Sequence, residues 1–457
     1  MTNFDALIVG MGQAGPSLAA RLSGAGMKVA VVERDKFGGT CVNDGCTPTK
    51  AMVASAYAAY AASRAEHYGV IVDGTPRVDM KRVKARKDEI VLRSRTGLEQ
   101  WMGSLKGATV YRGHACFVSP TEMRVGSEKL RAERIFLNVG GRPFVPNMPG
   151  LDAVPYLTNV SMVDVDFVPE HLLIVGSYVG LEFAQMFRRF GARVTVIEMG
   201  ERLVGREDED VSLAIQDVLR SEGIALRLGA ECITARKEPH GVSVGLDCRE
   251  GAPREAGTHF LLAVGRVPNT DDLGLEVAGI RTDKRGYIEV DDALRTSNPN
   301  VWALGDCNGK GAFTHTAYND YEIVADNLLA SAGRKHTDRI QAYALYIDPP
   351  LGRVGMSEAE IRRKGLRALV GKRPMARVAR AVEKGETHGF LKIHIEEGSQ
   401  RILGAALFGV GADESVHSVL DAAYSGMPYP EFQRRVRIHP TVSELLPTVL
   451  QDLSVLE

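Results

Sequence analysis

The sequence predicts an α/β protein made of two similar units followed by a C-terminal α+β domain. A plan of strand, glycine turn, helix and a second strand ending in a glutamate begins near residue 5 and again near residue 171. After about residue 340 the pattern changes, and alternating apolar strands at 390–395 and 402–408 indicate an antiparallel sheet. The two repeated units predict parallel sheets.

The first glycine turn lies between an apolar strand and a helix of small residues. Gly10 permits a tight turn, Gly12 lets backbone approach a pyrophosphate, and Gly15 lets the helix pack on the strand. The next strand ends at Glu33, where a carboxylate can accept hydrogen bonds from a ribose 2′-OH. An ordinary glycine turn with a surface glutamate is the alternative, but the order of elements favours a Rossmann-like dinucleotide site.

A second turn of the same kind runs from Gly176 to Gly180, and its following strand ends at Glu198. This turn is one residue shorter than the first and has no middle glycine, so either it takes a tighter path to the phosphates or binding is weakened. A carboxylate at the strand end favours the free 2′-OH of NAD(H) and repels the 2′-phosphate of NADP(H). Arg202 and Arg206 could partly offset that preference, or they are solvated surface charges.

Cys41 and Cys46 lie between the first unit's second strand and an alanine-rich segment expected to be helical over 49–67. A thiol near a helix N-terminus has its thiolate favoured, and a second thiol one turn away can close on it. Six cysteines in 457 residues are too few for a secreted disulfide framework, and no second ligand pair at zinc spacing follows. The pattern therefore favours a redox dithiol over a structural bridge or a metal site.

Both units close with a strand and a glycine turn, at Gly140 within 134–143 in the first unit and at Gly265 within 259–268 in the second. The chain is then expected to return to the first unit. A short apolar strand there ends next to Asp306, and a long helix follows through about residue 329. A cation-rich helical segment at 78–102 is interpreted as a solvated face.

Composition excludes several classes of function. The formal net charge is −1, which gives no electrostatic case for nucleic acid as a partner. No apolar run of about 18 residues is present, so no membrane span is expected. The N-terminal residues lead straight into a strand with no signal or transit pattern, and we expect a cytoplasmic protein.

Taken together, residues 38–50, the two glycine turns, Gly305–Asp306 and residues 439–444 resemble the class I pyridine nucleotide–disulfide oxidoreductases. That family includes dihydrolipoamide dehydrogenase, glutathione reductase, mercuric reductase and the reactive-chlorine-resistance flavoproteins. The resemblance covers essentially the whole chain in the family's order. It implies an FAD-binding domain formed by 1–150 and 270–338, an NAD(P)-binding domain at 151–269, and a dimerisation domain at 339–457.

The resemblance also implies roles for individual residues. Cys46 would be the charge-transfer thiol against FAD, and Cys41 the interchange thiol that meets substrate. Lys50 would pair with Glu182 beside the flavin, and Tyr178 would cover the flavin until nicotinamide enters. Without the resemblance, Lys50 and Glu182 would be interpreted as surface residues and Tyr178 as a packing aromatic.

His439 and Glu444 would carry the acid–base step, because a thiolate exchanging with a disulfide needs a proton donor near neutrality. In the resembled family this pair comes from the partner subunit, so a homodimer with a shared active site is expected. No metal ligands are expected. Asp306 would contact the ribityl chain of FAD. The full set of residues expected to contact the two cofactors is Gly10, Gly12, Gly15, Glu33, Gly39, Thr40, Lys50, Gly140, Asp306, Gly176, Gly180, Glu198 and Gly265.

The sequence therefore predicts an FAD-dependent oxidoreductase that passes electrons between NAD(P)H, FAD, the Cys41–Cys46 pair and a small disulfide or dithiol. Residues 308–320 are similar to the reactive-chlorine-resistance and mercuric-reductase-like branch. The last cysteine is Cys307, so the C-terminal thiols of a mercuric reductase are absent, and no N-terminal metal-binding domain is expected. The alternatives are a Hg(II), Cu(II) or oxidant reductase, and a flavoprotein redox sensor with an impaired nicotinamide site.

Overall fold

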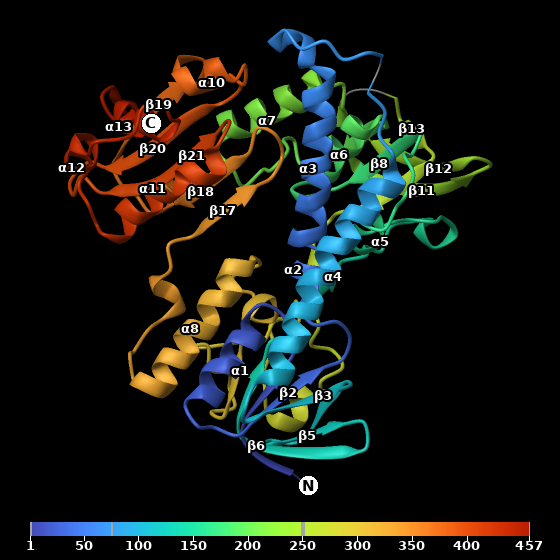
Figure 1. Ribbon diagram of the computed structural model, residues 1–457, viewed down its shortest axis with the longest axis vertical. Coiled ribbons are helices and arrows are strands. Elements are labelled where there is room, and N and C mark those ends of the chain that lie inside the picture. The colour runs from blue at the N-terminus through green and yellow to red at the C-terminus, as the bar shows by residue number, and fades with distance from the viewer. Residues whose placement is uncertain (1, 75, 248–251, 457) are drawn as a thin grey trace. The chain divides into compact units, whose positions relative to one another are not determined.

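The structure is a computed structural model that describes residues 2–74, 76–247 and 252–456 (Figure 1). It divides into two compact units, each assembled from three segments of the chain. Unit 1 comprises Met1–Ala51, Lys81–Phe144 and Gly265–Arg339, and unit 2 comprises Met52–Met80, Val145–Val264 and Ile340–Glu457. The four domain segments expected from the sequence stay a prediction.

Unit 1 is built on a seven-stranded sheet in the order β3-β2-β1-β6-β5-β4, with β16 also paired to β6. Five strands run parallel: β1 (Thr2–Val9), β2 (Val29–Glu33), β3 (Ala108–Arg112), β6 (Glu128–Leu137) and β16 (Val301–Ala303). The hairpin of β4 (Ala115–Ser119) and β5 (Glu122–Val125) extends the sheet in antiparallel fashion. The segment that returns after unit 2 thus supplies a strand of the first sheet, as the sequence predicts.

Both faces of this sheet are covered, which explains why the second half of β1 and nearly all of β2 are apolar. Ala6 and Ile8 point to a cluster with α1 (Ala14–Gly24) and α8 (Thr314–Ala330). Leu7 and Val9 point to the other face, where the β4–β5 hairpin packs. The parallel sheet places the first glycine turn at the carboxyl end of β1, where such folds bind ligands.

The remaining elements of unit 1 surround that edge. They are α2 (Gly39–Asn43), the first turns of α3 (Cys46–Ser63), α4 (Met80–Ser104), and a two-stranded ribbon of β7 (Gly141–Pro143) and β15 (Arg266–Pro268). The helix expected over 49–67 therefore begins at Cys46 and ends at Ser63, and a separate 3₁₀ turn covers Ala65–Tyr68.

The closing segment of the second unit, residues 259–268, divides at its glycine turn. Residues 259–268 do not form a single strand, because β14 (His259–Leu262) pairs parallel with β8 in unit 2 and β15 pairs antiparallel with β7 in unit 1. The backbone turns at Gly265, whose φ of +124° suits glycine and interrupts an extended chain.

Unit 2 contains the second parallel sheet, in the order β10-β9-β8-β14. Its strands are β8 (His171–Val175), β9 (Arg193–Ile197), β10 (Ala225–Arg227) and β14, and its helices include α5 (Asn159–Met162), α6 (Val179–Phe190) and α7 (Glu209–Ser221). An antiparallel sheet of β11 (Glu231–Glu238), β12 (Gly241–Asp247) and β13 (Arg254–Gly257) packs its apolar face against β8 and β14.

The C-terminal part of unit 2 is a six-stranded antiparallel sheet in the order β17-β18-β21-β20-β19-β22. The strands are β17 (Ala342–Leu345), β18 (Leu351–Gly355), β19 (Ala368–Pro374), β20 (Phe390–Glu396), β21 (Ile402–Phe408) and β22 (Leu453–Val455). Its helices are α9 (Glu358–Arg363), α10 (Ala379–Glu383), α11 (Ala412–Tyr424), α12 (Tyr429–Arg434) and α13 (Leu446–Val449). The apolar face of α11 packs on this sheet, which confirms the expected α+β architecture. Across the described residues, none of the helices has the length and apolar character needed to cross a membrane.

Candidate functional site

The first glycine turn is shaped so that side chains are excluded from it. Gly10 has a φ of +97°, and a Cβ there would clash with the carbonyl oxygen of Asn138. A Cβ on Gly15 would clash with the carbonyl of Gly10, and one on Gly12 would lie 3.4 Å from the Asn138 amide nitrogen. The turn opens directly into α1, whose first turn carries no acidic residue. Backbone N–H groups at such a helix start form a cradle for a pyrophosphate.

Asn138 links the parts of this cradle and was not identified from the sequence. Its side-chain amide donates to the carbonyl of Gly10 at 3.2 Å, and its Oδ1 lies 3.5 Å from where a Cβ of Gly305 would be. Its position just after β6, at the same sheet edge as the turn, is the signal that could have identified it.

Glu33 lies at the end of β2, as expected, and faces the turn. Its Oε2 accepts from the Met11 N–H at 2.8 Å and its Oε1 accepts from the Asp35 N–H at 2.8 Å. Only 8% of the residue is exposed. Two backbone donors thus hold the carboxylate beside the first turn, where a ribose would lie if a dinucleotide occupied the cradle.

A second loop packs against the same turn. Gly39 has a φ of +56°, and a Cβ there would lie 2.9 Å from the Cα of Gly12. The N–H of Gly38 donates to Met11 at 2.8 Å, so the loop that precedes the two cysteines is fastened to the cradle. Thr40 follows, and its Oγ1 accepts from a guanidinium nitrogen of Arg266 at 3.2 Å.

Arg266 ties together three segments of unit 1. Its guanidinium also donates to the carbonyl of Gly141, and its Nε lies 3.6 Å from Oδ2 of Asp306. Burial raises the pKa of Asp306, although Arg266 acts in the opposite direction. Gly140 precedes this contact with a φ of +64°. Arg266 directly follows Gly265 in the strand and glycine turn that close the second unit. That pattern identified the segment from the sequence, but it did not indicate the contacts of Arg266.

The two cysteines occupy successive short elements. Cys41 lies in α2, and Cys46 is the first residue of α3. Both are thiols in the structure, and Sγ of Cys46 lies 3.4 Å from the hydroxyl oxygen of Thr314, the first residue of α8. The pKa of Cys41 lies above its usual range, mainly because Cys46 hydrogen-bonds to its side chain and also because Cys41 is buried. Cys41 is therefore the thiol that holds its proton, with Cys46 at the helix N-terminus beside a hydroxyl.

Tyr178 and Glu182 lie at the start of α6 in unit 2. Both make specific hydrogen bonds, so Glu182 is not an ordinary surface residue and Tyr178 is not only a packing aromatic. Tyr178 has a φ of 54°, and its hydroxyl donates to the carbonyl of Ala344 at 3.0 Å. Burial raises its pKa above the usual range. Glu182 is 2% exposed, and its Oε1 accepts from the Tyr346 N–H at 3.1 Å. Lys50 belongs to unit 1, so its expected pairing with Glu182 stays a prediction.

The shorter second turn also excludes side chains at its two glycines. A Cβ on Gly176, whose φ is +112°, would clash with the carbonyl of Ala263. A Cβ on Gly180 would lie 3.1 Å from Ile174 and 3.2 Å from Ala263, so α6 approaches β8 and β14 closely. Glu198 follows β9, and its Oε1 accepts from the Gly200 N–H at 2.9 Å.

Of the two cations that follow Glu198, Arg206 is exposed and Arg202 is half-buried. Arg202 lies 3.8 Å from the carboxylate of Glu209, so a nearby acid partly neutralises it. Gly265, the last expected cofactor residue, opens the third segment of unit 1 beside β15.

His439 and Glu444 form a pair, as the resemblance implies. Nδ1 of His439 lies 3.0 Å from Oε1 and 2.9 Å from Oε2 of Glu444. The imidazole side chain is 73% exposed and the carboxylate only 14%. The carboxylate therefore holds one ring nitrogen and leaves the other directed away from it.

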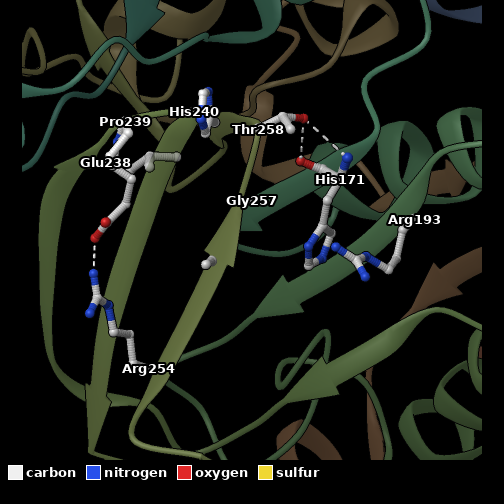
Figure 2. Close-up of a pocket in the computed structure, with 10 residues that line it drawn as sticks. His171, Arg193, Glu238, Pro239, His240, Arg254, Gly257 and Thr258 are labelled. Atoms are coloured by element: carbon white, nitrogen blue, oxygen red, sulfur yellow. Dashed lines mark hydrogen bonds and ion pairs between the residues drawn. The ribbon is translucent and has the colours of Figure 1, made fainter.

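A pocket in unit 2 contains none of the expected site residues. Its lining comes from β8, β9 and the β11–β13 sheet, and Figure 2 shows the ring of His171 next to the guanidinium of Arg193. Nε2 of His171 lies 2.9 Å from the hydroxyl of Thr195, and burial followed by Arg193 lowers the pKa of His171.

A cluster of ionisable side chains lies elsewhere in unit 2, where Asp208, Glu358 and His394 have the spacing of metal ligands. The ammonium of Lys392 occupies the cation position: it lies 2.9 Å from Asp208, 2.6 Å from Asp210 and 2.7 Å from Glu358. The cluster is therefore built around a lysine.

Comparison with protein families matches residues 4–320 to pyridine nucleotide-disulphide oxidoreductase and residues 341–450 to the dimerisation domain of that family. The probable pyridine nucleotide-disulfide oxidoreductase RclA of Escherichia coli (strain K12) is 34% identical over 455 residues, with 98% of each chain covered. A mercuric reductase of Streptomyces lividans is 32% identical over 99% of this chain and 97% of its own. A dihydrolipoyl dehydrogenase of Chlamydia muridarum is 31% identical over 97% and 95%.

Among solved structures, the Cu(II) complex of the HOCl-induced flavoprotein disulfide reductase RclA from Escherichia coli superposes with a TM-score of 0.89 at 33% identity. That match covers 98% of this chain and 99% of the other. The chain belongs to the pyridine nucleotide-disulphide oxidoreductases, a family of flavin-dependent enzymes.

Proposed function

We propose that the protein catalyses electron transfer between a nicotinamide nucleotide and a small disulfide, with Cys41 and Cys46 as its redox pair. The observation that carries this proposal is the geometry of unit 1, where the loop before the two thiols is fastened to the first glycine turn. The cradle, Glu33 and Asp306 are the donors and acceptors that an FAD molecule requires. When bound, FAD supplies a ring that accepts a hydride from nicotinamide and passes an electron pair to sulfur.

The two thiols divide the disulfide chemistry between them. In the reduced pair, a base takes the proton of Cys41, and the Cys41 thiolate attacks a substrate disulfide and forms a mixed disulfide; the same proton then goes to the first substrate thiolate as it leaves. Cys46 then attacks Cys41, so a Cys41–Cys46 disulfide forms and the second substrate thiol leaves. The helix N-terminus at Cys46 favours the thiolate of this step.

The proton for the departing thiol needs a donor, and the His439–Glu444 pair has the chemistry for it. Glu444 accepts from Nδ1–H of His439 and so leaves Nε2 to hold or release the proton. We assign this role to the partner subunit's His439, since residues 341–450 match the family's dimerisation domain.

NAD(H) is the proposed nucleotide, because Glu198 ends β9 where a 2′-phosphate would be repelled. Glu198→Gln is expected to raise kcat/KM for NADPH relative to NADH about tenfold, which corresponds to ~1.4 kcal/mol. Glu231→Gln, an exposed carboxylate at the start of β11, is the matched control. An unchanged nucleotide ratio in Glu198→Gln would remove the basis for the NAD(H) preference.

The test of the proposed function is an anaerobic titration of the purified flavoprotein with NADH and, separately, NADPH. A long-wavelength absorbance band that appears with NADH and is lost in Cys46→Ser supports the redox pair and the nucleotide site together. Cys46→Ser should retain FAD and lose disulfide reduction. If dithionite gives the band but neither nucleotide does, the shortened second turn no longer supports reduction by a nicotinamide nucleotide. The alternative of a flavoprotein redox sensor is then favoured.

Reduction of a metal ion on the same scaffold is the second candidate. It is favoured by the Cu(II) complex of RclA, to which this chain is 33% identical, and by the mercuric reductase relative. A comparison of NADH oxidation driven by lipoamide, by Cu(II) with a Cu(I)-trapping chelator, and by Hg(II) separates the candidates. A higher kcat/KM for a metal ion than for every small disulfide would favour the metal reductase.

A further inference from the structure

One face of α6 is polar yet buried. Glu182 and Gln185 are 2% and 4% exposed, and the side chain of Arg189 is 5% exposed. Residues at this spacing share one face of a helix. Burying three polar side chains costs free energy unless each forms hydrogen bonds, so the partners of these side chains indicate the role of this helix face.

The partners lie in one short stretch, Ala344–Asp348, which begins in β17 and continues past its end. Alternate residues of the stretch meet successive turns of α6: Tyr178 bonds to Ala344, Glu182 to Tyr346, and Gln185 to Asp348. The two segments stay in step because two residues of extended chain and one turn of helix both advance by about 6 Å. We call this set of contacts the α6 ladder.

Gln185 makes the most restrictive contact of the ladder. Its Oε1 accepts from the Asp348 N–H at 2.7 Å, and its Nε2 donates to the Asp348 carbonyl at 2.7 Å. The amide therefore pairs with both backbone groups of one residue, as a neighbouring strand would. Arg189 secures the same residue through its side chain, with Nη1 2.7 Å from Oδ2 of Asp348.

Glu222 closes the arrangement from the other side. It accepts from Nε2 of Gln185 at 2.8 Å and from Arg189 at 2.7 Å and 2.9 Å. The Gln185 amide is thus held from two directions and has little rotational freedom, which is what a residue that fixes its neighbours needs.

We propose that Gln185 is a positioning residue for the nicotinamide half of the reaction. It fixes the path of Ala344–Asp348 along α6, and that stretch in turn holds the Tyr178 hydroxyl and the Glu182 carboxylate. The consequence for catalysis rests on the proposed function and on the roles that the family resemblance implies for Tyr178, as the cover of the nicotinamide site, and for Glu182, as the partner of Lys50. Gln185 itself touches no reacting atom and acts through these two residues.

The test replaces Gln185 by methionine, which keeps its length and volume and removes all three hydrogen bonds of the side chain, two to Asp348 and one to Glu222. The matched control is Gln216→Met, because Gln216 is 2% exposed and its side chain donates only to Ser212, one turn earlier in α7. Amide hydrogen exchange of residues 343–348 is measured in both purified flavoproteins. The two half-reactions, reduction by NADH and oxidation by a disulfide, are followed separately by anaerobic stopped flow.

Gln185→Met is expected to speed exchange of this stretch about tenfold and to slow reduction by NADH about tenfold, with FAD content and the disulfide half-reaction within about twofold of wild type. Gln216→Met should leave all four quantities near wild type. Exchange that matches the control overturns the proposal, and so does faster exchange with an unaltered NADH half-reaction. Failure of the proposed function shows separately, as a wild-type protein that neither nucleotide reduces; the exchange comparison still decides whether Gln185 holds the stretch.

Discussion

Nδ1 of His439 lies 2.9 Å from a carboxylate oxygen of Glu444, and the two side chains differ sharply in exposure, at 73% and 14%. A carboxylate that is mostly covered orients an imidazole that is mostly open. The pair thus leaves the second ring nitrogen directed away from the carboxylate, which is what the acid–base role proposed for His439 requires.

His439→Gln is expected to slow the disulfide half-reaction about 100-fold, since it removes the proton donor of the departing thiol. Reduction by NADH should stay within about twofold, because no step there uses this imidazole. Glu444→Gln should slow the same half-reaction less, as the ring remains but loses its orienting carboxylate. The control is Glu431→Gln, whose carboxylate forms an exposed ion pair with Arg435. Equal losses in both half-reactions would contradict the assignment.

The Cys46→Ser variant is expected to make Cys41 more reactive toward alkylation. Cys46 is the largest cause of the raised pKa of Cys41, so its removal should lower that pKa toward the ordinary value for a thiol. Alkylation needs the thiolate, so the labelling rate of Cys41 should begin to rise at lower pH in the variant than in the reduced wild type. Iodoacetamide labelling followed by peptide mass spectrometry across the neutral to alkaline range measures this. An unchanged pH profile would show that the two thiols are not coupled.

Gly10→Ala should yield a protein that is purified without flavin. The added methyl group would clash with the Asn138 carbonyl, and the φ of +97° is strained for alanine. Gly26→Ala is a matched control, because Gly26 has a φ of +86° but no atom within 4 Å of the new methyl group. It should retain flavin and lose about 1 kcal/mol of stability from backbone strain alone. The amount of flavin released on denaturation per mole of protein tests this prediction. Full flavin occupancy in Gly10→Ala would show that the flavin does not bind at the first glycine turn.

The two glycine turns and their sheets could be predicted from the sequence because strand, turn and helix are local patterns of a few residues. Gly10 and Glu33 could be named because each answers a local requirement, a left-handed turn or the end of a strand. The strand and the glycine turn within 259–268 could be predicted as well, but not that the chain leaves one sheet and joins another there, because that depends on pairing with distant strands.

Residues whose role depends on long-range contact were missed for the same reason. Asn138 bonds to Gly10 across 128 positions and Thr314 meets Cys46 across 268. Gln185 is an unremarkable glutamine on an amphipathic helix until Asp348 is placed beside it. Tyr178 and Glu182 were named only through the family resemblance, because nothing in their immediate neighbours distinguishes them from packing or surface residues.

Lys392→Met is expected to destabilise unit 2 by about 3 kcal/mol, because Glu358 would lose its nearest cation, although Asp208 keeps Arg353 at 2.9 Å and Asp210 keeps Lys372 at 2.6 Å. The side chain is 1% exposed and contacts Asp208 and Glu358 within 2.9 Å. Lys372→Met is the control, since that lysine is 43% exposed and pairs with Asp210 at the cluster's edge. It should cost about 1 kcal/mol or less.

The same substitution should also weaken the acid dependence of stability. The imidazole of His394, 3.6 Å from the carboxylate, followed by Lys392, lowers the pKa of Glu358 from 4.5 to about 2. A carboxyl group with a lowered folded pKa stabilises the protein above its unfolded pKa, and that contribution is lost as the pH falls toward the folded value. Wild type should therefore lose stability between about pH 4.5 and pH 2, and Lys392→Met should lose less over that window because its carboxylates already titrate nearer their unfolded values. Urea unfolding followed by far-ultraviolet circular dichroism at several pH values measures both effects, and parallel pH profiles for the two proteins would show that Lys392 does not set the charge state of the cluster.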